Sequence, residues 1–97
     1  IISSAKAGVE GLTVALAAEL APNIRINCIA PSLTKSKMAS LVIKNSSVEE
    51  SISKMHPLKR IGEGIDSANL ASFLLTEKSS WITGQVIGVD GGRSSIA

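Results

Sequence analysis

The sequence of 97 residues is poor in the groups that cross-link small domains. Its single cysteine, Cys28, has no internal disulfide partner, and no cluster of cysteine and histidine has the spacing of a zinc site. Disulfides and structural metals therefore do not compensate for the small size, and a reducing, cytoplasmic setting fits best. Tyrosine is absent altogether.

Strong charge and long apolar runs are also lacking. Ten Lys and Arg residues against eight Asp and Glu residues give a net charge of +2, which is too small and too scattered for a nucleic-acid binder. The longest apolar runs have four or five residues, whereas a helix that spans a bilayer needs about 20. We therefore expect neither a nucleic-acid partner nor a membrane partner. A composition of 44% hydrophobic and 19% charged residues is typical of a globular protein.

The residue pattern in the first third of the sequence predicts a helix followed by a strand. Over residues 2–20, apolar side chains recur at steps of three and four, which predicts a helix that Pro22 ends. Residues 24–30 alternate with a period of two and predict a buried strand that ends at Pro31.

The middle of the chain predicts short, loosely anchored helices. One is expected within Lys35 to Asn45, and a second follows a capping box formed by Ser47 and Glu50. Residues 56–62 are expected to form an irregular connection.

A second well-defined helix and a second strand complete the pattern. Asp66 is predicted to be the N-cap of a helix that runs to about Thr76, and residues 85–90 predict a strand followed by Gly91, Gly92 and a short polar tail. Helices that alternate with strands are typical of the α/β class with a doubly wound parallel sheet. Parallel strands need neighbours on both sides and cover on both faces, and two strands are too few for that.

The start of the sequence also leads us to expect that the chain is part of a larger domain. The chain begins at Ile1 rather than Met, inside a helical pattern without a capping residue. We therefore expect further residues to precede it, and we expect the chain to be the closing part of a larger domain.

Three segments resemble the short-chain dehydrogenase/reductases: residues 4–22, residues 24–31 (IRINCIAP) and residues 82–92, which run from ITGQV to DGG. The resemblance covers nearly all of the sequence. It implies a Rossmann-type domain with three αβα layers, of which residues 1–97 are the C-terminal part, and NAD or NADP as the cofactor. The glycine fingerprint and the catalytic serine of the family would lie before Ile1.

The family's catalytic pair is a tyrosine and a lysine that lie four residues apart on one helix face. Lys6 stands at the lysine position, where the resemblance implies that it holds the nicotinamide ribose and lowers the pKa of the tyrosine. Ile2 stands at the tyrosine position and has no proton to give. Ser3 and Ser4 are nearby, but a serine hydroxyl is too weak an acid without its own activator, so a polar helix face is the simpler interpretation.

The segment 31–36 resembles the family's Pro-Gly segment, which contacts the nicotinamide. Thr34 is the best candidate for a cofactor contact, and Ser36 offers a second hydroxyl. Ser32 replaces the usual glycine, so we expect strain or a different loop path if the position needs a positive φ. An ordinary polar loop is the alternative. The residues implied to contact the cofactor are Lys6, Pro31, Ser32, Leu33, Thr34 and Ser36.

The remaining candidates are weaker. Residues 35–60 correspond to the family's substrate lid, which varies with the substrate. His56 stands alone before a proline and is expected at the surface, with a substrate contact as the alternative. Trp81 is expected in a core or an interface rather than at a ligand.

The first of three functions consistent with the sequence is an NAD(P)-dependent oxidoreductase fragment that acts on a small carbonyl or alcohol and uses Lys6. The second is a redox-inactive dinucleotide-binding relative, which Ile2 favours. The third is an oligomerisation module, because the resemblance also implies a homodimer or homotetramer.

Overall fold

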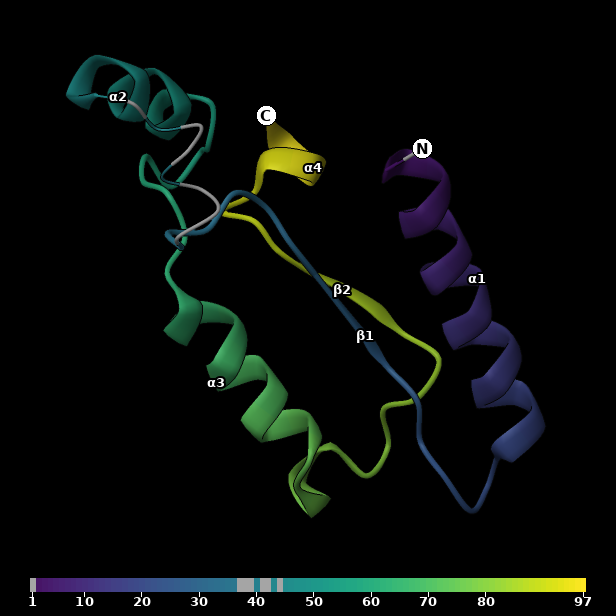
Figure 1. The fold of residues 1–97 in the computed structure, drawn as a ribbon. Helices are drawn as coiled ribbons and strands as arrows, with labels where there is room; N and C mark the ends of the chain where they lie inside the picture. The colour runs from purple at the N-terminus through teal and green to yellow at the C-terminus, as the bar shows by residue number, and fades with distance from the viewer. Residues whose placement is uncertain (1, 37–39, 41–42, 44) are drawn as a thin grey trace. The chain divides into compact units, whose positions relative to one another are not determined.

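The structure is a computed structural model that describes residues 2–36, 40, 43 and 45–97 (Figure 1). Contacts divide the chain into a first unit, residues 1–29 and 70–87, and a second unit, residues 30–69 and 88–97. Each strand begins in the first unit and ends in the second. In chain order the elements are α1 (Ile2–Leu20), β1 (Cys28–Pro31), α2 (Ser46–Lys54), α3 (Gly64–Leu74), the 3-10 helix η2 (Glu77–Ser79), β2 (Val86–Val89) and α4 (Arg93–Ile96).

Helix α1 has the predicted bounds. The backbone N–H groups of Asn23 and Ile24 both donate to the carbonyl of Leu20 at 3.0 Å, which closes the helix around Pro22. Ala17 is buried. A Cβ atom on Gly84, whose φ is +72°, would lie 3.5 Å from the Cβ of Ala17, so the turn before β2 approaches α1 at a small side chain.

Strands β1 and β2 form a two-stranded parallel sheet. Cys28 N donates to Gln85 O at 2.8 Å, and four residues later on both strands Ser32 N donates to Val89 O at 3.3 Å. Because both partners advance together along the chain, the strands are parallel. Their carboxyl ends therefore meet at one edge, which positions the site described below.

The strands differ from the prediction in length and burial. Each has four residues: β1 ends at Pro31 as predicted but begins at Cys28 rather than at residue 24, and β2 is shorter by one residue at each end than the predicted range 85–90. Ahead of β1 Gly84 N donates to Ile26 O at 2.7 Å, and the side chain of Asn27 adds two bonds, since its amide donates to Ile82 O and its carbonyl accepts from Gln85 N, both at 3.1 Å. The three residues of β1 from 28 to 30 are half-buried, because only one strand flanks them among the described residues.

Arg25 organises the polar interior of the first unit. Its guanidinium donates to five oxygen atoms: the carbonyls of Leu74, Thr76, Ser79 and Ile82 and the hydroxyl of Ser79. The distances run from 3.0 to 3.4 Å, and Ser79 is fully buried. One cation therefore pairs the carbonyls at the end of α3 with those that precede β2.

Three predictions about where helices begin differ from the structure. The N-cap of α2 is Asn45, whose side chain accepts from Val48 N at 3.0 Å. The prediction of a capping box formed by Ser47 and Glu50 is therefore wrong. Helix α3 begins two residues before Asp66, whose carboxylate instead reaches back to Glu63 N at 2.8 Å. The expected polar tail contains the short helix α4. The helix expected within residues 35–45 falls largely outside the described residues.

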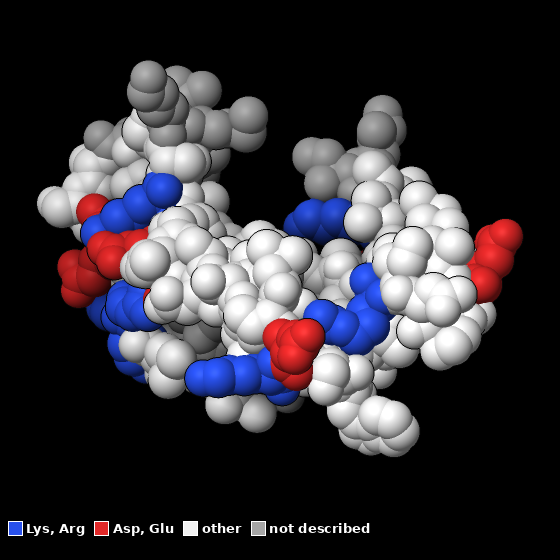
Figure 2. Space-filling view, turned by 90° about the horizontal axis from the view of Figure 1, so that it is seen from below, with Lys and Arg blue, Asp and Glu red and all other residues white. Residues whose placement is uncertain are grey.

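Apolar burial is sparse in both units. Ala17 and Ile61 are the only buried apolar residues in the described parts of the chain, and Val9 and Leu12 on α1 are more than half exposed. Trp81, expected in a core or an interface, is 98% exposed in this chain. Basic and acidic side chains are interspersed on the face drawn in Figure 2. No helix within residues 2–36 or 45–97 is long and apolar enough to cross a membrane.

We expect Arg25→Gln to lower the free energy of unfolding by about 2 to 3 kcal/mol, because it removes a charged group that donates to four carbonyls and one hydroxyl in the first unit. Urea unfolding followed by circular dichroism measures the change. The control is Arg93→Gln, which changes an exposed arginine whose described side-chain partner is the sulfur of Met55. Equal losses in the two variants would contradict the role assigned to Arg25.

Candidate functional site

The loop that follows β1 is held by backbone hydrogen bonds to Gly62. Gly62 N donates to Leu33 O at 3.1 Å, and Lys35 N donates to Gly62 O at 2.9 Å. Thr34 lies between these two bonds in a parallel bridge, so its own N–H and C=O point away from Gly62. A Cβ atom on Gly62 would lie 3.3 Å from Thr34 Oγ1, so only a residue without a side chain leaves the threonine undisturbed.

Ser32 occupies its position without backbone strain. Among the described residues, φ is positive only at Lys59, Gly84, Gly91 and Gly92. The strain expected at Ser32 if its position needs a positive φ therefore does not arise. The backbone keeps its place in the ladder through Ser32 N and Val89 O, and the hydroxyl is directed to His56.

His56 is buried, which corrects the expectation of a surface residue. It is 1% exposed, and its Nε2 lies 2.9 Å from Ser32 Oγ. Its Nδ1 lies 2.9 Å from the carbonyl oxygen of Ile52. A carbonyl only accepts, so Nδ1 carries a proton and donates to it, and Nε2 is in hydrogen-bond contact with the Ser32 hydroxyl. The sequence signal was the four-residue spacing from Ile52, which places the ring near the last carbonyls of α2.

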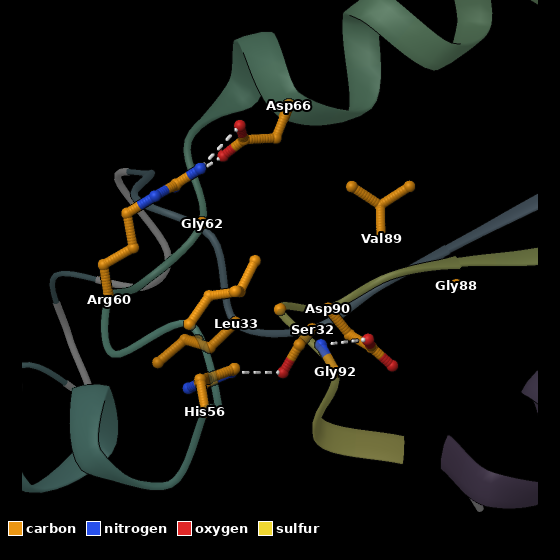
Figure 3. Close-up of a pocket in the computed structure, with 12 residues that line it drawn as sticks. Ser32, Leu33, His56, Arg60, Gly62, Asp66, Gly88, Val89, Asp90 and Gly92 are labelled. Atoms are coloured by element: carbon orange, nitrogen blue, oxygen red, sulfur yellow. Dashed lines mark hydrogen bonds and ion pairs between the residues drawn. The ribbon is translucent and has the colours of Figure 1, made fainter. Parts of the chain in front are cut away.

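A cavity of about 370 Å³ opens beside this pair within the second unit (Figure 3). Its walls combine the loop after β1, the end of β2 with the turn that follows it, residues 56–62 and the first turn of α3. The lining residues are Ser32, Leu33, His56, Leu58, Arg60, Gly62, Asp66, Gly88, Val89, Asp90, Gly91 and Gly92.

The carboxylate of Asp90 accepts hydrogen bonds from the turn that follows β2. Its carboxylate accepts from Gly92 N at 3.0 Å, from Ser94 N at 3.2 Å and from the Ser94 hydroxyl. The Ser94 hydroxyl, assisted by these backbone amides, lowers the pKa of Asp90. A carboxylate held in this way is a poor proton acceptor, so Asp90 stabilises the turn rather than serving as a base.

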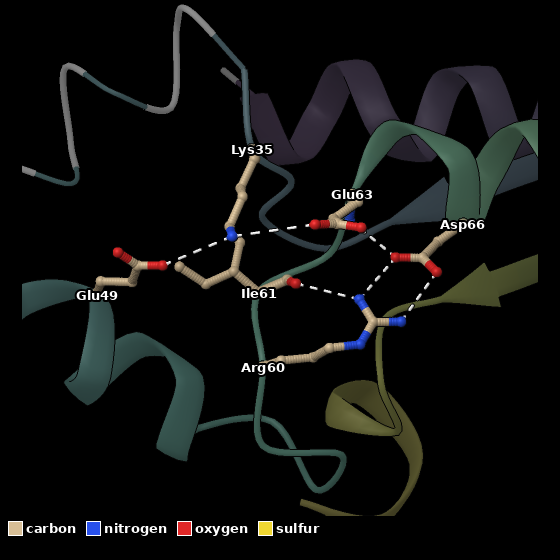
Figure 4. A network of polar contacts seen from close by, with 6 residues as sticks. All are labelled: Lys35, Glu49, Arg60, Ile61, Glu63 and Asp66. Carbon is tan, nitrogen blue, oxygen red and sulfur yellow. Dashed lines mark hydrogen bonds and ion pairs between the residues drawn. The ribbon is translucent and has the colours of Figure 1, made fainter. Parts of the chain in front are cut away.

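An ion-pair network fixes the segment that carries Gly62 (Figure 4). The two terminal guanidinium nitrogens of Arg60 lie 2.8 and 2.9 Å from the two carboxylate oxygens of Asp66. Lys35 from the loop after β1 lies 3.9 Å from Glu49 and 4.0 Å from Glu63. Sequence analysis missed the pair of Arg60 and Asp66, because a six-residue spacing across a loop and a helix start has no periodic signal.

The structure brings part of the predicted set together. Ser32, Leu33 and Thr34 are half-buried neighbours in the second unit, where Pro31 and Ser36 are exposed. Lys6 lies on α1 in the first unit and is exposed. The side chain of Ile2 lies outside what the structure describes. Within the described ranges, no three His, Cys, Asp or Glu side chains are placed to hold a metal ion.

The loop has the donors and acceptors that a nicotinamide amide requires. Thr34 Oγ1 donates to Ser32 O at 3.0 Å and so keeps its oxygen lone pairs for an incoming donor. The N–H of Thr34, directed away from Gly62, offers a donor for an amide carbonyl. Residues 31–34 thus fit the contact that the resemblance implies.

Comparisons with known proteins cover almost the whole chain. The family described as enoyl-(acyl carrier protein) reductase matches residues 1–94. The human dehydrogenase/reductase SDR family member 4 is 43% identical over 93% of this chain and 33% of its own length. The chain therefore spans about a third of the curated relatives that it matches.

Solved structures show the same similarity. A short-chain type dehydrogenase/reductase from Mycobacterium ulcerans has a TM-score of 0.83 and 37% identity, over 91% of this chain and 32% of that one. ElxO, solved with NADP bound, has a TM-score of 0.85 and 38% identity, over 95% of this chain and 38% of that one. Their similarity identifies the fold here as part of a doubly wound α/β domain of Rossmann type.

Asp66 is expected to stay ionised far into the acid range. Hydrogen bonds from Arg60, assisted by the N–H of Glu63, lower the pKa of Asp66 from 3.8 to about 2. Because this native pKa is depressed, the ion pair stabilises the fold above about pH 4 and is lost as the pH falls toward 2. Carboxyl ¹³C NMR should show the pKa of Asp66 rising toward 3.8 in Arg60→Gln.

The matched control for this titration is Lys35→Gln, which removes a neighbouring cation without touching the carboxylate of Asp66. It should leave the pKa of Asp66 unchanged. A native Asp66 that titrates near its ordinary value would contradict the geometry.

Proposed function

Because the chain belongs to the short-chain dehydrogenase/reductase family, we propose that residues 1–97 are the C-terminal part of one NAD(P)-binding domain. This domain transfers hydride between a nicotinamide cofactor and a small carbonyl or alcohol substrate. The observation that supports the proposal is that residues 31–34 lie at the carboxyl end of a parallel strand, where the N–H of Thr34 is directed away from Gly62. Ligands of open α/β sheets bind at that edge.

Exposed apolar residues support the larger domain. Val9 and Leu12 point from α1 into solvent, although their spacing is that of a buried face. In the first unit Leu75 is also 87% exposed. Exposed apolar groups of this kind are typical of surfaces that another part of a protein covers. The complete protein is proposed to be a cytoplasmic homodimer or homotetramer.

The loop residues and Lys6 have separate tasks in this proposal. Residues 31–34 orient the amide of the nicotinamide, with Thr34 as the main contact and Ser36 as a second hydroxyl. Lys6 binds the ribose hydroxyls and contributes positive charge near the reacting oxygen. The bound dinucleotide supplies the hydride. Residues 35–60 cover the substrate.

Ile2 removes the family's usual proton donor. Losing a positioned acid typically slows a reaction by about 100-fold to 10,000-fold. We therefore propose slow turnover with a normal affinity for the cofactor. The second candidate function, dinucleotide binding without redox chemistry, rests on the same residue and is distinguished by whether any hydride is transferred.

Lys6→Ala should lower kcat/KM of the complete protein by about 100-fold, because it removes a charge-assisted contact to the cofactor. The assay follows the absorbance of NADH and NADPH with panels of ketones and alcohols. Lys78→Ala, an exposed lysine on η2, is the matched control and should keep wild-type activity. Normal turnover in Lys6→Ala would exclude a catalytic role for this residue. Binding without turnover in the wild type would favour the second candidate.

Ile2→Tyr should raise kcat by about 100-fold or more, because it restores a phenol four residues before Lys6. The matched control is Ile2→Phe, which adds an aromatic ring without the hydroxyl and should leave kcat unchanged. The same absorbance assay measures both variants. An equal effect of the two substitutions would show that the ring alone, and not an acid, changes the rate.

A further inference from the structure

Three hydrogen bonds in series connect helix α2 to Thr34 (Figure 3 shows the middle one). The Nδ1–H of His56 donates to the Ile52 carbonyl at 2.9 Å, and its Nε2 lies at hydrogen-bond distance, 2.9 Å, from the Ser32 hydroxyl. The carbonyl of Ser32 then accepts from Thr34 Oγ1 at 3.0 Å. The last turn of α2 is thereby linked to the proposed cofactor contact.

The imidazole of His56 has little freedom to move. The ring is 1% exposed. On its other side, a Cβ atom on Gly91 would lie 3.5 Å from the Cβ of His56 and 3.8 Å from its Cδ2, so the glycine backbone packs against the histidine. Leu58 N also donates to Gly91 O at 3.1 Å, which keeps that contact in place. A ring fixed on three sides holds its hydrogen-bond partner in one position.

Ser32 passes this constraint to Thr34. Its N–H donates to Val89 O at 3.3 Å and its hydroxyl contacts His56, so one backbone bond and one side-chain bond hold Ser32 in place. The carbonyl of Ser32 in turn accepts from Thr34 Oγ1. Without the contact to His56, the residue whose carbonyl accepts from Thr34 keeps only its backbone bond to Val89.

We propose that His56 is a positioning residue for the cofactor. It acts through Ser32 to hold the hydroxyl of Thr34, and it couples the lid helix α2 to cofactor binding. The inference rests on the proposed function, because it assigns a purpose to the loop only if that loop contacts a dinucleotide. Coupling between two sites is reciprocal, so bound cofactor should also stabilise the last turn of α2.

The test is a fluorescence titration of the complete protein with NADPH and NADH. Loss of one hydrogen bond in the series should raise the Kd by about fivefold in His56→Phe and in Ser32→Ala. The double variant should bind no more weakly than either single variant, because both break the same connection. His56→Gln places an amide near Nε2 and should restore most of the affinity.

The matched control is Ser79→Ala, which removes a fully buried hydroxyl in the first unit that bonds to Leu74, Thr76 and Arg25. It should reduce stability without changing the Kd. Steady-state kinetics should show His56→Phe raising the KM for the cofactor while kcat changes by less than about twofold. Hydrogen exchange should show added protection near Ile52 when cofactor binds the wild type but not His56→Phe.

The outcomes separate the two claims. If the wild type binds dinucleotide and the His56 and Ser32 variants bind equally well, the positioning role is wrong and the proposed function stands. The same holds if the effects of the two single variants add in the double variant. If the wild type binds neither NADPH nor NADH, both the proposed function and the positioning role are wrong. Should His56→Phe not fold, Ser32→Ala and His56→Gln decide the question.

Discussion

The parallel register of β1 and β2 is the constraint on which the site depends. Two strands that advance together end at the same edge, and each of them delivers a turn there. The loop after β1 carries Ser32 and Thr34, and the turn after β2 carries Asp90 and its two glycines. An antiparallel pair would have placed these two segments at opposite ends of the sheet. The cavity beside His56 exists because both turns open at one edge.

Polar contacts rather than apolar burial define the local geometry. Arg25 satisfies carbonyls from the end of α3 to the segment before β2, and Arg60 with Asp66 fixes the segment that carries Gly62. Such contacts have strict distances and angles, whereas apolar packing tolerates many arrangements. This explains how a chain with few buried apolar side chains still holds its candidate site in one arrangement.

The sequence predicted the regular parts of the fold better than their ends. The bounds of α1 follow from periodicity and Pro22, and both strands were placed correctly, although their lengths were not. Errors arose where side chains accept from backbone N–H groups, as Asn27 does before β1 and Asn45 does at α2. The resemblance located the loop Pro31–Thr34, and its cofactor contacts stay a prediction. The hydrogen bond of His56 to Ser32, a residue 24 positions away, has no local pattern that could reveal it.

The glycines after β2 and the serine after β1 impose different limits on evolutionary change at the same edge. Gly91 and Gly92 have positive φ, and a Cβ atom on Gly92 would lie 3.0 Å from Ile96, so a replacement there meets resistance from both backbone and neighbours. Ser32 has no such backbone restriction. Replacement of Ser32 is therefore limited by the bonds of its side chain, whereas replacement of Gly91 or Gly92 is limited by the backbone.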